Sequence, residues 1–593
     1  MNKSNLKLPN CSLLVTLACA VALLNPDSAV QAAQAQLITG ATLSGIPGAD
    51  ALLVFDGKIM EVGLKSTLEL HCPSPCKKSD FSGKFITPAF HDTHAHPTSA
   101  GARSFRVQVS GSSVASIAQT VSAYAKAHPE LQWIVGRGWD AAGFGKLLPT
   151  RFDLDRAEKT RPVLLVDSDG HQAWTNSAAV VAAGITKNTR NPEGGTIVRD
   201  SAGEATGLFL ENAADLVYSR VPENSIEQIQ AFILKGQEES LAGGFSAFHG
   251  GGVSLKTAAA YVDLEKQGKL KQRAYLWADL DLTDPVGSDP NATPPSSAKE
   301  TFEAVLEFEK QQPASSKVHI SAFKGFVDGV ISSYTGALLA PYADRPDVTG
   351  EPTISQEKLN KEVLRANQAG FPVALHAIGD RAVRMSLNAF ENSLKVLGKG
   401  VLNGRQNRIE HIEVLSPDDA ARFGALGVAA AFQPSHMYFG SASGSYYPAR
   451  LGRSRLEHTF AWKEAQNGGA LLLFGTDFPV VAPDAIESLY CAVNRTYRNG
   501  TAFTPQQAID KKSALFKSKL EFVEPKLPSY IIGTRNKLIT PGLTSPLLVL
   551  SKLKLLTISR VDLSEFKLAV SVSLNETKSN SNPKSKSCKF IFN

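Results

Sequence analysis

Eight short apolar segments recur between residues 85 and 476, and this repetition constrains the fold more than any other feature of the chain. Helical patterns lie between them, for example at residues 356–368 and 416–426. Strands that alternate with helices form a parallel sheet, and eight such units favour a closed barrel over an open sheet. We therefore predict an α/β fold of the (β/α)8, TIM-type barrel class. The predicted strands are residues 85–91, 245–249, 273–280, 318–325, 372–376, 407–411, 427–433 and 471–476.

Polar side chains stand at or just after the C-terminal ends of several of these segments. The first segment leads into His94-Ala95-His96, and alternation along an extended chain places both imidazoles on one side. Because the C-terminal ends of barrel strands meet at one mouth, these side chains predict a shared metal site. Taken singly, each has a plainer reading as a hydrogen-bonded core histidine, a turn aspartate or a structural lysine. The six candidate ligands are His94, His96, Lys324, His376, His411 and Asp477.

The N-terminus has the layout of a secretory signal peptide. Lys3 and Lys7 precede an apolar run over residues 11–24, and a stretch of small residues follows. That run is shorter than the roughly 20 apolar residues that span a bilayer. We predict that residues 1–32 are a signal peptide cleaved after Ala32, with a retained anchor helix as the alternative. The mature chain is then expected to be periplasmic or secreted, with no stable membrane span.

Three further regions complete the predicted organisation. Residues 33–84 form a small β module, in which Asp56-Gly57 between two apolar runs signals a hairpin. Residues 85–510 form the barrel, with a large insertion after its first strand, over residues 100–240, that is expected to lie over the catalytic face. Residues 511–593 form a divergent basic segment, which is rich in serine and lysine and is expected to be partly disordered.

Charge and cysteine content narrow the range of partners and compartments. Residues 511–593 hold 15 basic and 5 acidic side chains, which leaves 47 basic and 51 acidic side chains in residues 1–510. The body of the chain is therefore mildly acidic and shows no nucleic-acid footprint. Cys72 and Cys76 could close a small disulfide loop in an oxidising compartment or stay as free thiols, whereas a zinc site lacks a second ligand pair nearby.

Together, the ordered motifs resemble the amidohydrolase superfamily, and within it the YtcJ-like branch that includes N-substituted formamide deformylase. The resemblance spans about residues 36–510. Two features depart from the family pattern: Ala89 replaces the usual glycine before the first histidine, and no Gly-Lys-x-Ala-Asp segment follows Asp510. The matching motifs are HAH at 94–96, GRGWD at 136–140, DGH at 169–171, NS at 176–177, GLFLEN at 207–212, HAIGDRA at 376–382, RIEH at 408–411, QP at 433–434 and GTDFP at 475–479.

The resemblance implies a metal centre with one or two divalent ions. His94, His96 and Asp477 would bind one ion, and His376 and His411 would bind a second ion or share the first. Lys324 would bridge as a carbamate, because a cationic amine repels a metal ion and only a carboxylated or neutral amine can serve as a ligand. Zinc is the expected metal, with iron, manganese and nickel left open because all accept nitrogen and oxygen donors.

The resemblance also implies the catalytic and substrate-binding roles. The catalytic set is Asp477, Lys324 and His171: Asp477 would carry a proton from water to the leaving nitrogen, and His171 would stabilise the carbonyl oxygen. The candidates for substrate contact are His171, Glu211, His436 and Trp139, each with a surface or packing role as the alternative.

The implied activity is metal-dependent hydrolysis of a C–N bond in an amide, N-acyl, N-formyl or cyclic amide substrate. The same fold also supports deamination of a heterocycle. A third alternative is a secreted binding protein, catalytically impaired by its altered tail. The expected partner is a small molecule, and a homodimer stays open.

Overall fold

The computed structural model describes residues 35–514 and 547–550, with gaps at residues 45, 141–143, 145–147, 168–171, 193–194, 281–300, 441–445 and 512. The predicted signal peptide and most of the basic segment 511–593 therefore lie outside the described residues. The chain divides into two compact units, with the boundary between Ile86 and Thr87. The short strand β21 (Leu547–Leu550) belongs to the second unit.

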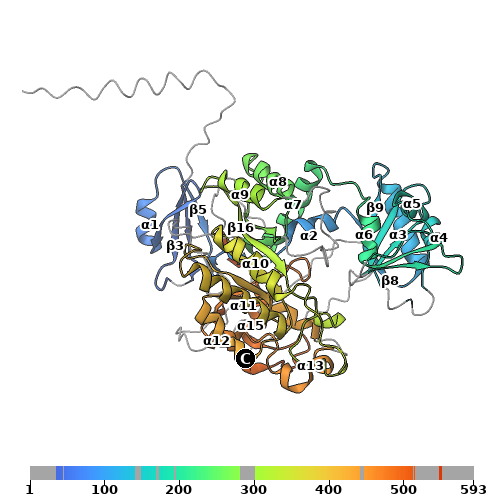
Figure 1. The fold of residues 1–593 in the computed structure, drawn as a ribbon. Helices are drawn as coiled ribbons and strands as arrows, with labels where there is room; N and C mark the ends of the chain where they lie inside the picture. The colour runs from blue at the N-terminus through green and yellow to red at the C-terminus, as the bar shows by residue number, and fades with distance from the viewer. Residues whose placement is uncertain are drawn as a thin grey trace, which may run out of the picture. The chain divides into compact units, whose positions relative to one another are not determined.

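The first unit is the predicted β module, built on a four-stranded sheet (Figure 1). Leu68 of helix α1 packs against Leu37 and Leu53 of this sheet, which gives the unit a small core of its own. The sheet order is β4-β3-β1-β5, and β2 pairs in parallel with β6 outside this sheet. The elements are β1 (Ala35–Thr39), β2 (Thr42–Leu43), β3 (Ala51–Phe55), β4 (Lys58–Gly63), α1 (Lys65–His71), β5 (Cys76–Asp80) and β6 (Phe85–Pro88).

Two local features of this unit follow from its sequence. Asp56 and Gly57 join the antiparallel strands β3 and β4, and both have positive φ angles, 46° and 74°, as a tight two-residue hairpin turn requires. Cys72 and Cys76 form a disulfide with their Cα atoms 6.0 Å apart. The bond consumes both thiols, so this pair is not a zinc site.

The second unit contains the predicted barrel, a sheet of eight parallel strands in the order β20-β19-β18-β17-β16-β15-β14-β7. Its first and last strands approach each other at their C-terminal ends, where Thr93 N donates to Phe474 O at 3.3 Å and Ala95 pairs with Phe478. Seven of the eight predicted segments are confirmed as barrel strands. The first prediction, residues 85–91, was too long: residues 85–88 form β6 of another sheet, and the barrel strand begins at Phe90. The barrel strands are β7 (Phe90–Asp92), β14 (Phe245–Gly251), β15 (Arg273–Asp279), β16 (Val318–Phe326), β17 (Val373–Ala377), β18 (Arg408–His411), β19 (Ala429–Phe432) and β20 (Leu471–Phe474).

Helices follow the barrel strands, and their capping residues and apolar spacing explain where they form. In α10 the side chain of Ser355 accepts a hydrogen bond from Lys358 N, which caps the first turn, and Leu359, Val363 and Ala366 bury one face at helical spacing. The helices are α7 (Ile226–Ala242), α8 (Leu255–Lys266), α9 (Phe302–Lys310), α10 (Gln356–Gln368), α11 (Asp380–Leu397), α12 (Pro417–Leu426), α13 (Tyr446–Leu456), α14 (Trp462–Asn467) and α15 (Ala485–Asn494), with 3-10 turns η3 (Ile331–Ser333), η4 (Pro434–Gly440) and η5 (Pro505–Gln507).

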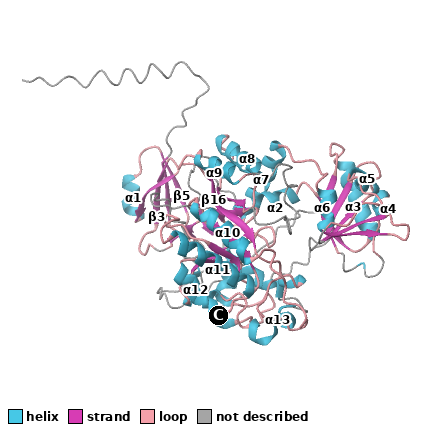
Figure 2. Ribbon diagram, viewed as in Figure 1, coloured by secondary structure: helices cyan, strands magenta, loops and turns pink. Residues whose placement is uncertain are grey.

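The predicted insertion has an architecture of its own, a six-stranded sheet in the order β12-β13-β11-β10-β9-β8 with helices beside it (Figure 2). Its core includes Trp139, Trp174 and Leu165. That it lies over the catalytic face stays a prediction. The elements are β8 (Val107–Gly111), α3 (Val114–Ala127), β9 (Ile134–Trp139), α4 (Arg151–Asp155), β10 (Val163–Asp167), β11 (Gln172–Thr175), α5 (Ser177–Ala182), β12 (Gly195–Arg199), β13 (Ala205–Glu211), η2 (Asn212–Ala214) and α6 (Asp215–Tyr218).

Helix α2 (Pro97–Arg103) begins directly after His96 and crosses α7 at two glycines. A Cβ atom on Gly101 would lie 1.8 Å from Phe232 O, and one on Gly236 would lie 1.8 Å from Pro97 O. Only glycine permits this approach, which holds the segment following the His-x-His pair against α7. Among the described residues, no helix is both long enough and apolar enough to cross a membrane.

Candidate metal centre

Three side chains from the two ends of the barrel sheet converge on one point. Nε2 of His96 lies 3.2 Å from Oδ1 of Asp477, and Nε2 of His94 lies 3.5 Å from the same oxygen. One ligand-type atom from each of the three residues lies within 4.8 Å of the others. The predicted convergence of the first strand with the eighth therefore exists in the structure.

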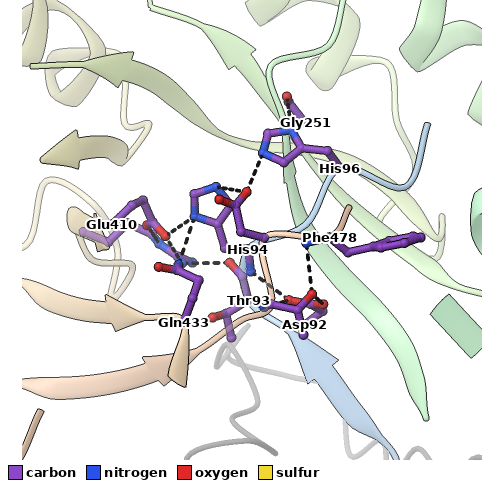
Figure 3. A network of polar contacts seen from close by, with 11 residues as sticks. Asp92, Thr93, His94, His96, Gly251, Glu410, Gln433 and Phe478 are labelled. Atoms are coloured by element: carbon purple, nitrogen blue, oxygen red, sulfur yellow. Dashed lines mark hydrogen bonds and ion pairs between the residues drawn. The ribbon is translucent and has the colours of Figure 1, made fainter. Parts of the chain in front are cut away.

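The opposite ring nitrogens of the two histidines are already engaged. Nδ1 of His94 donates to Oε2 of Glu410 at 2.7 Å, and Nδ1 of His96 donates to Gly251 O at 2.9 Å (Figure 3). Arg408 in turn holds Glu410, with Nη2 donating to Oε2 at 3.0 Å. Each ring is thus oriented by a partner behind it, which leaves Nε2 facing Asp477, as metal-binding histidines generally require.

Three more histidines lie beside this group, at the ends of β17 and β18 and in η4. The ring of His411 lies 4.5 Å from that of His376 and 4.8 Å from that of His94, measured between centroids. The ring of His436 stacks on that of His411, with the two centroids 6.2 Å apart. Nε2 of His376 is 3.1 Å from Gly329 O, so this nitrogen donates to the backbone. Nearby strand ends have therefore gathered five imidazoles.

The backbone is irregular at two of the candidate ligands. His411 and Asp477 have positive φ angles of 75° and 57°, a conformation that costs a non-glycine residue about 1–3 kcal/mol. Asp92 helps to hold the second of these turns, because its carboxylate accepts from Thr476 N at 2.9 Å and from His94 N at 3.3 Å. The irregular backbone directs the side chains of His411 and Asp477 toward the candidate metal centre, which regular strand alternation would not do.

Lys324 is also buried at this end of the barrel, between aromatic rings. Its Nζ lies 5.4 Å from the ring centre of Trp277 and 5.1 Å from that of Phe326. Burial lowers its pKa to about 8, so a neutral amine is accessible near physiological pH. A neutral amine is the form that reacts with carbon dioxide, and carboxylation of Lys324 stays a prediction.

The electrostatics and unpaired atoms fit a divalent cation. Burial holds the pKa of His94 and of His411 well below the usual range, so both imidazoles are neutral donors. Burial opposes ionisation of Asp477, but the neighbouring His94 and His96 hold its pKa below the usual range. Within the described residues, His411 Nδ1 and His436 Nε2 are buried without a hydrogen-bond partner. Neutral imidazole nitrogens, two of them without a hydrogen-bond partner, and one carboxylate are a suitable donor set for zinc.

The remaining predicted site residues lie elsewhere. His171 is outside the described residues, and so is the side chain of Glu211, whose backbone ends β13. Trp139 has no exposed surface: it lies in the insertion's core, and its Nε1 donates to Leu165 O at 3.0 Å. Trp139 therefore packs the insertion, and its assignment as a substrate contact is corrected. His436, expected to contact substrate, lies instead among the candidate ligands.

The sequence interpretation left out two side chains that shape the centre. Glu410 stands next to His411 in the RIEH motif, and regular strand alternation would place these neighbouring side chains on opposite faces. Asp328 follows the predicted fourth strand, and its carboxylate accepts from three backbone N–H groups, those of Ala337, Ile378 and Gly379, at 2.8–2.9 Å. An isolated acidic residue in a loop carries no pattern that would have revealed this role.

Comparison with known proteins gives the family. A model described as "Amidohydrolase family" matches residues 79–515. The chain is also 31% identical over 479 residues to a putative amidohydrolase, YtcJ, of Bacillus subtilis, covering 79% of this chain and 84% of that protein. The chain belongs to the amidohydrolase family, whose metal dependence agrees with the donor set described above.

Other relatives are similar over comparable lengths. Protein LONG AFTER FAR-RED 3 of Arabidopsis thaliana is 28% identical over 87% of both chains. N-substituted formamide deformylase of Arthrobacter pascens is 25% identical, covering 79% of this chain and 84% of the enzyme. Among solved structures, an uncharacterized metal-dependent hydrolase from Pyrococcus horikoshii aligns with a TM-score of 0.64 at 24% identity, over 82% of this chain and 92% of that one. This last match supports the fold alone.

Proposed function

We propose that this chain hydrolyses a C–N bond in a small amide, N-acyl, N-formyl or cyclic amide substrate. The observation that carries the proposal is the convergence of His94, His96 and Asp477 from opposite ends of the barrel sheet. Such a neutral-nitrogen and carboxylate set holds a divalent ion, zinc being the first choice. Family membership makes hydrolysis the expected use of that ion.

A bound ion would supply Lewis-acid polarisation of the scissile carbonyl and lower the pKa of a water molecule from about 15.7 toward about 7. The chain's own groups then move the proton. Asp477 is ionised and lies between two oriented imidazoles, so its carboxylate can accept a proton from water and pass it to the leaving nitrogen. Lys324, carboxylated on its accessible neutral amine, would add a further oxygen donor.

One comparison supports the choice of bond. The chain shares 25% identity with an enzyme named for deformylation of N-substituted formamides, over most of both chains. Residues 1–32 lead us to propose a periplasmic or secreted location, which fractionation of expressing cells with and without these residues would test.

A substrate screen tests the proposal most sharply. The full chain, reconstituted with zinc, is incubated with N-substituted formamides, N-acyl amino acids and cyclic amides, and both amine and carboxylate products are measured. The proposal predicts equal amounts of the two products from at least one class, and loss of both in Asp477→Asn. Release of ammonia from heterocyclic amines without a carboxylate would make the chain a deaminase. Binding without turnover by zinc-loaded protein would make it a binding protein.

A further inference from the structure

Large apolar side chains stay exposed around the end of the barrel where the candidate metal centre lies. Among the described residues between 245 and 514, five large apolar side chains are exposed, and four of them stand on segments that follow the C-terminal ends of barrel strands or close such a strand. We call these four the apolar rim: Phe326 (37% exposed), Leu339 (42%), Phe439 (37%) and Val480 (51%).

The two phenylalanines of the apolar rim lie against side chains of the candidate centre. Phe326 is the last residue of β16, and its ring centre lies 5.3 Å from that of His376 and 5.1 Å from Nζ of Lys324. Phe439 lies in η4, which follows β19, and its ring centre is 4.7 Å from that of His436. A substituent on a carbonyl group held at the centre would therefore meet these rings within a few bond lengths.

The other two members of the rim are tied to the ends of neighbouring strands. Leu339 N donates to Oδ1 of Asp380 at 2.8 Å, and Asp380 begins α11 directly after β17. Val480 N donates to the backbone oxygen of Asp477 at 2.7 Å, which closes a turn on the candidate ligand itself. Both apolar side chains are thus held at the same end of the barrel as the centre.

The placement of the rim separates it from ordinary surface exposure. Single exposed apolar residues are common and need no ligand, and Val396, the fifth exposed side chain, is such a case. It stands 16 residues into α11 from Asp380, about 24 Å along a helix that begins at the mouth. The rim instead gathers apolar side chains around one polar centre, which is the composition of a small-molecule site.

We propose that the substrate carries a large apolar group, aromatic by preference, on its acyl carbon or amide nitrogen, and that the apolar rim binds this group. An aromatic ring can stack on Phe326 or Phe439 as well as leave water. A charged group at the same place would lose its hydration, and none of the four rim side chains could replace it with a hydrogen bond. This inference rests on the proposed function and narrows its substrate class.

Hydroxamate binding to the zinc-loaded full chain tests the inference without turnover. Acetohydroxamate and phenylacetohydroxamate chelate zinc through the same atoms, so the ratio of their dissociation constants isolates the phenyl group. Calorimetry should show the phenyl compound binding about 10- to 100-fold more tightly. The ratio should fall about fivefold or more in the double variant Phe326→Ala, Phe439→Ala. Val396→Ala is the control and should keep the full ratio.

Three results of this experiment would overturn the inference. They are a ratio below about tenfold in the unaltered chain, a double variant that keeps the full ratio, and an equal loss of the ratio in Val396→Ala. Because the readout is a ratio, a general weakening of zinc binding changes both dissociation constants and leaves the comparison intact.

A second measurement needs no variant, in case the double variant fails to fold. In a series of straight-chain hydroxamates from acetyl to hexanoyl, each added methylene should tighten binding about three- to fourfold. An analogue of the longest compound that ends in a carboxylate should bind more weakly. Affinities that do not rise with chain length, or tighter binding of the carboxylate, would contradict the inference.

Failure of the inference and failure of the proposed function give different results. A chain that cleaves amides but binds the two hydroxamates equally would refute the inference alone. A chain that shows the predicted ratio but cleaves no amide would refute the proposed function alone.

Discussion

Nδ1 of His94 donates to Oε2 of Glu410 across 2.7 Å, and both side chains are almost completely buried. The contact joins the end of β7 to β18 and fixes which nitrogen of His94 faces Asp477. Glu410 is itself held by Arg408, whose guanidinium also donates to Thr93 O at 2.8 Å. The orientation of the first candidate ligand therefore depends on a chain of buried charges behind it.

Replacing the carboxylate in Glu410→Gln should weaken metal binding without unfolding the barrel. The amide cannot anchor the His94 N–H as strongly, and loss of such a supporting carboxylate typically lowers metal affinity 10- to 100-fold. Competition for zinc with a chromophoric chelator measures the change. Glu309→Gln is the matched control, because Glu309 contacts Nδ1 of His319 at a similar distance, 2.8 Å, but outside the centre. Equal zinc affinities for the two variants would show that Glu410 does not support His94.

Gly101→Ala should destabilise the second unit. The new Cβ would meet the carbonyl oxygen of Phe232 at 1.8 Å, a backbone atom that cannot rotate away. Overpacking of this kind costs about 1–3 kcal/mol, which exceeds the gain of at most about 1 kcal/mol in helix propensity. All the tryptophans lie in the second unit, so their fluorescence during urea unfolding reports on it. Ser99→Ala in the same helix adds no atoms and should unfold normally; an unchanged midpoint for Gly101→Ala would refute the close packing.

Removing the disulfide in a Cys72→Ser, Cys76→Ser variant should loosen the first unit only. The two cysteines are 4 residues apart, and their bond lowers the conformational entropy of the unfolded chain. For so short a loop this effect stabilises the folded state by about 2 kcal/mol. Hydrogen exchange should accelerate at the amides of Leu37 and Leu53 and stay unchanged at strand β17. Zinc content should not change. A loss of zinc in this variant would show that the disulfide supports the metal centre.

The barrel was predictable because its strands are short, apolar and regularly separated by amphipathic helices. Its mouth was predictable for the same reason: His94, His376 and His411 all stand at strand ends, and parallel strands share one C-terminal edge. The side-chain orientations that could not be predicted depend on departures from regular strand geometry. The positive φ at His411 breaks the alternation that would have pointed Glu410 away from the centre.

The assignments in loops and in the insertion were harder for a second reason. A histidine after a strand can contact substrate, metal or core, and the sequence gives no distance to decide among them. For His436 the answer came from the unpaired nitrogen and the neighbouring Asp477. For Trp139 it came from complete burial and a hydrogen bond within the insertion. Both depend on tertiary packing, which no local pattern records.

The zinc content of the purified chain tests the central claim, that side chains from distant strands meet around a divalent ion. The unaltered chain, stripped and reloaded, is compared with His94→Asn and with His458→Asn, a histidine held by Glu464 away from the centre. We predict bound zinc in the unaltered chain and in His458→Asn, and a loss of at least one ion per chain in His94→Asn. An unaltered, folded chain that retains no zinc after loading would contradict the account.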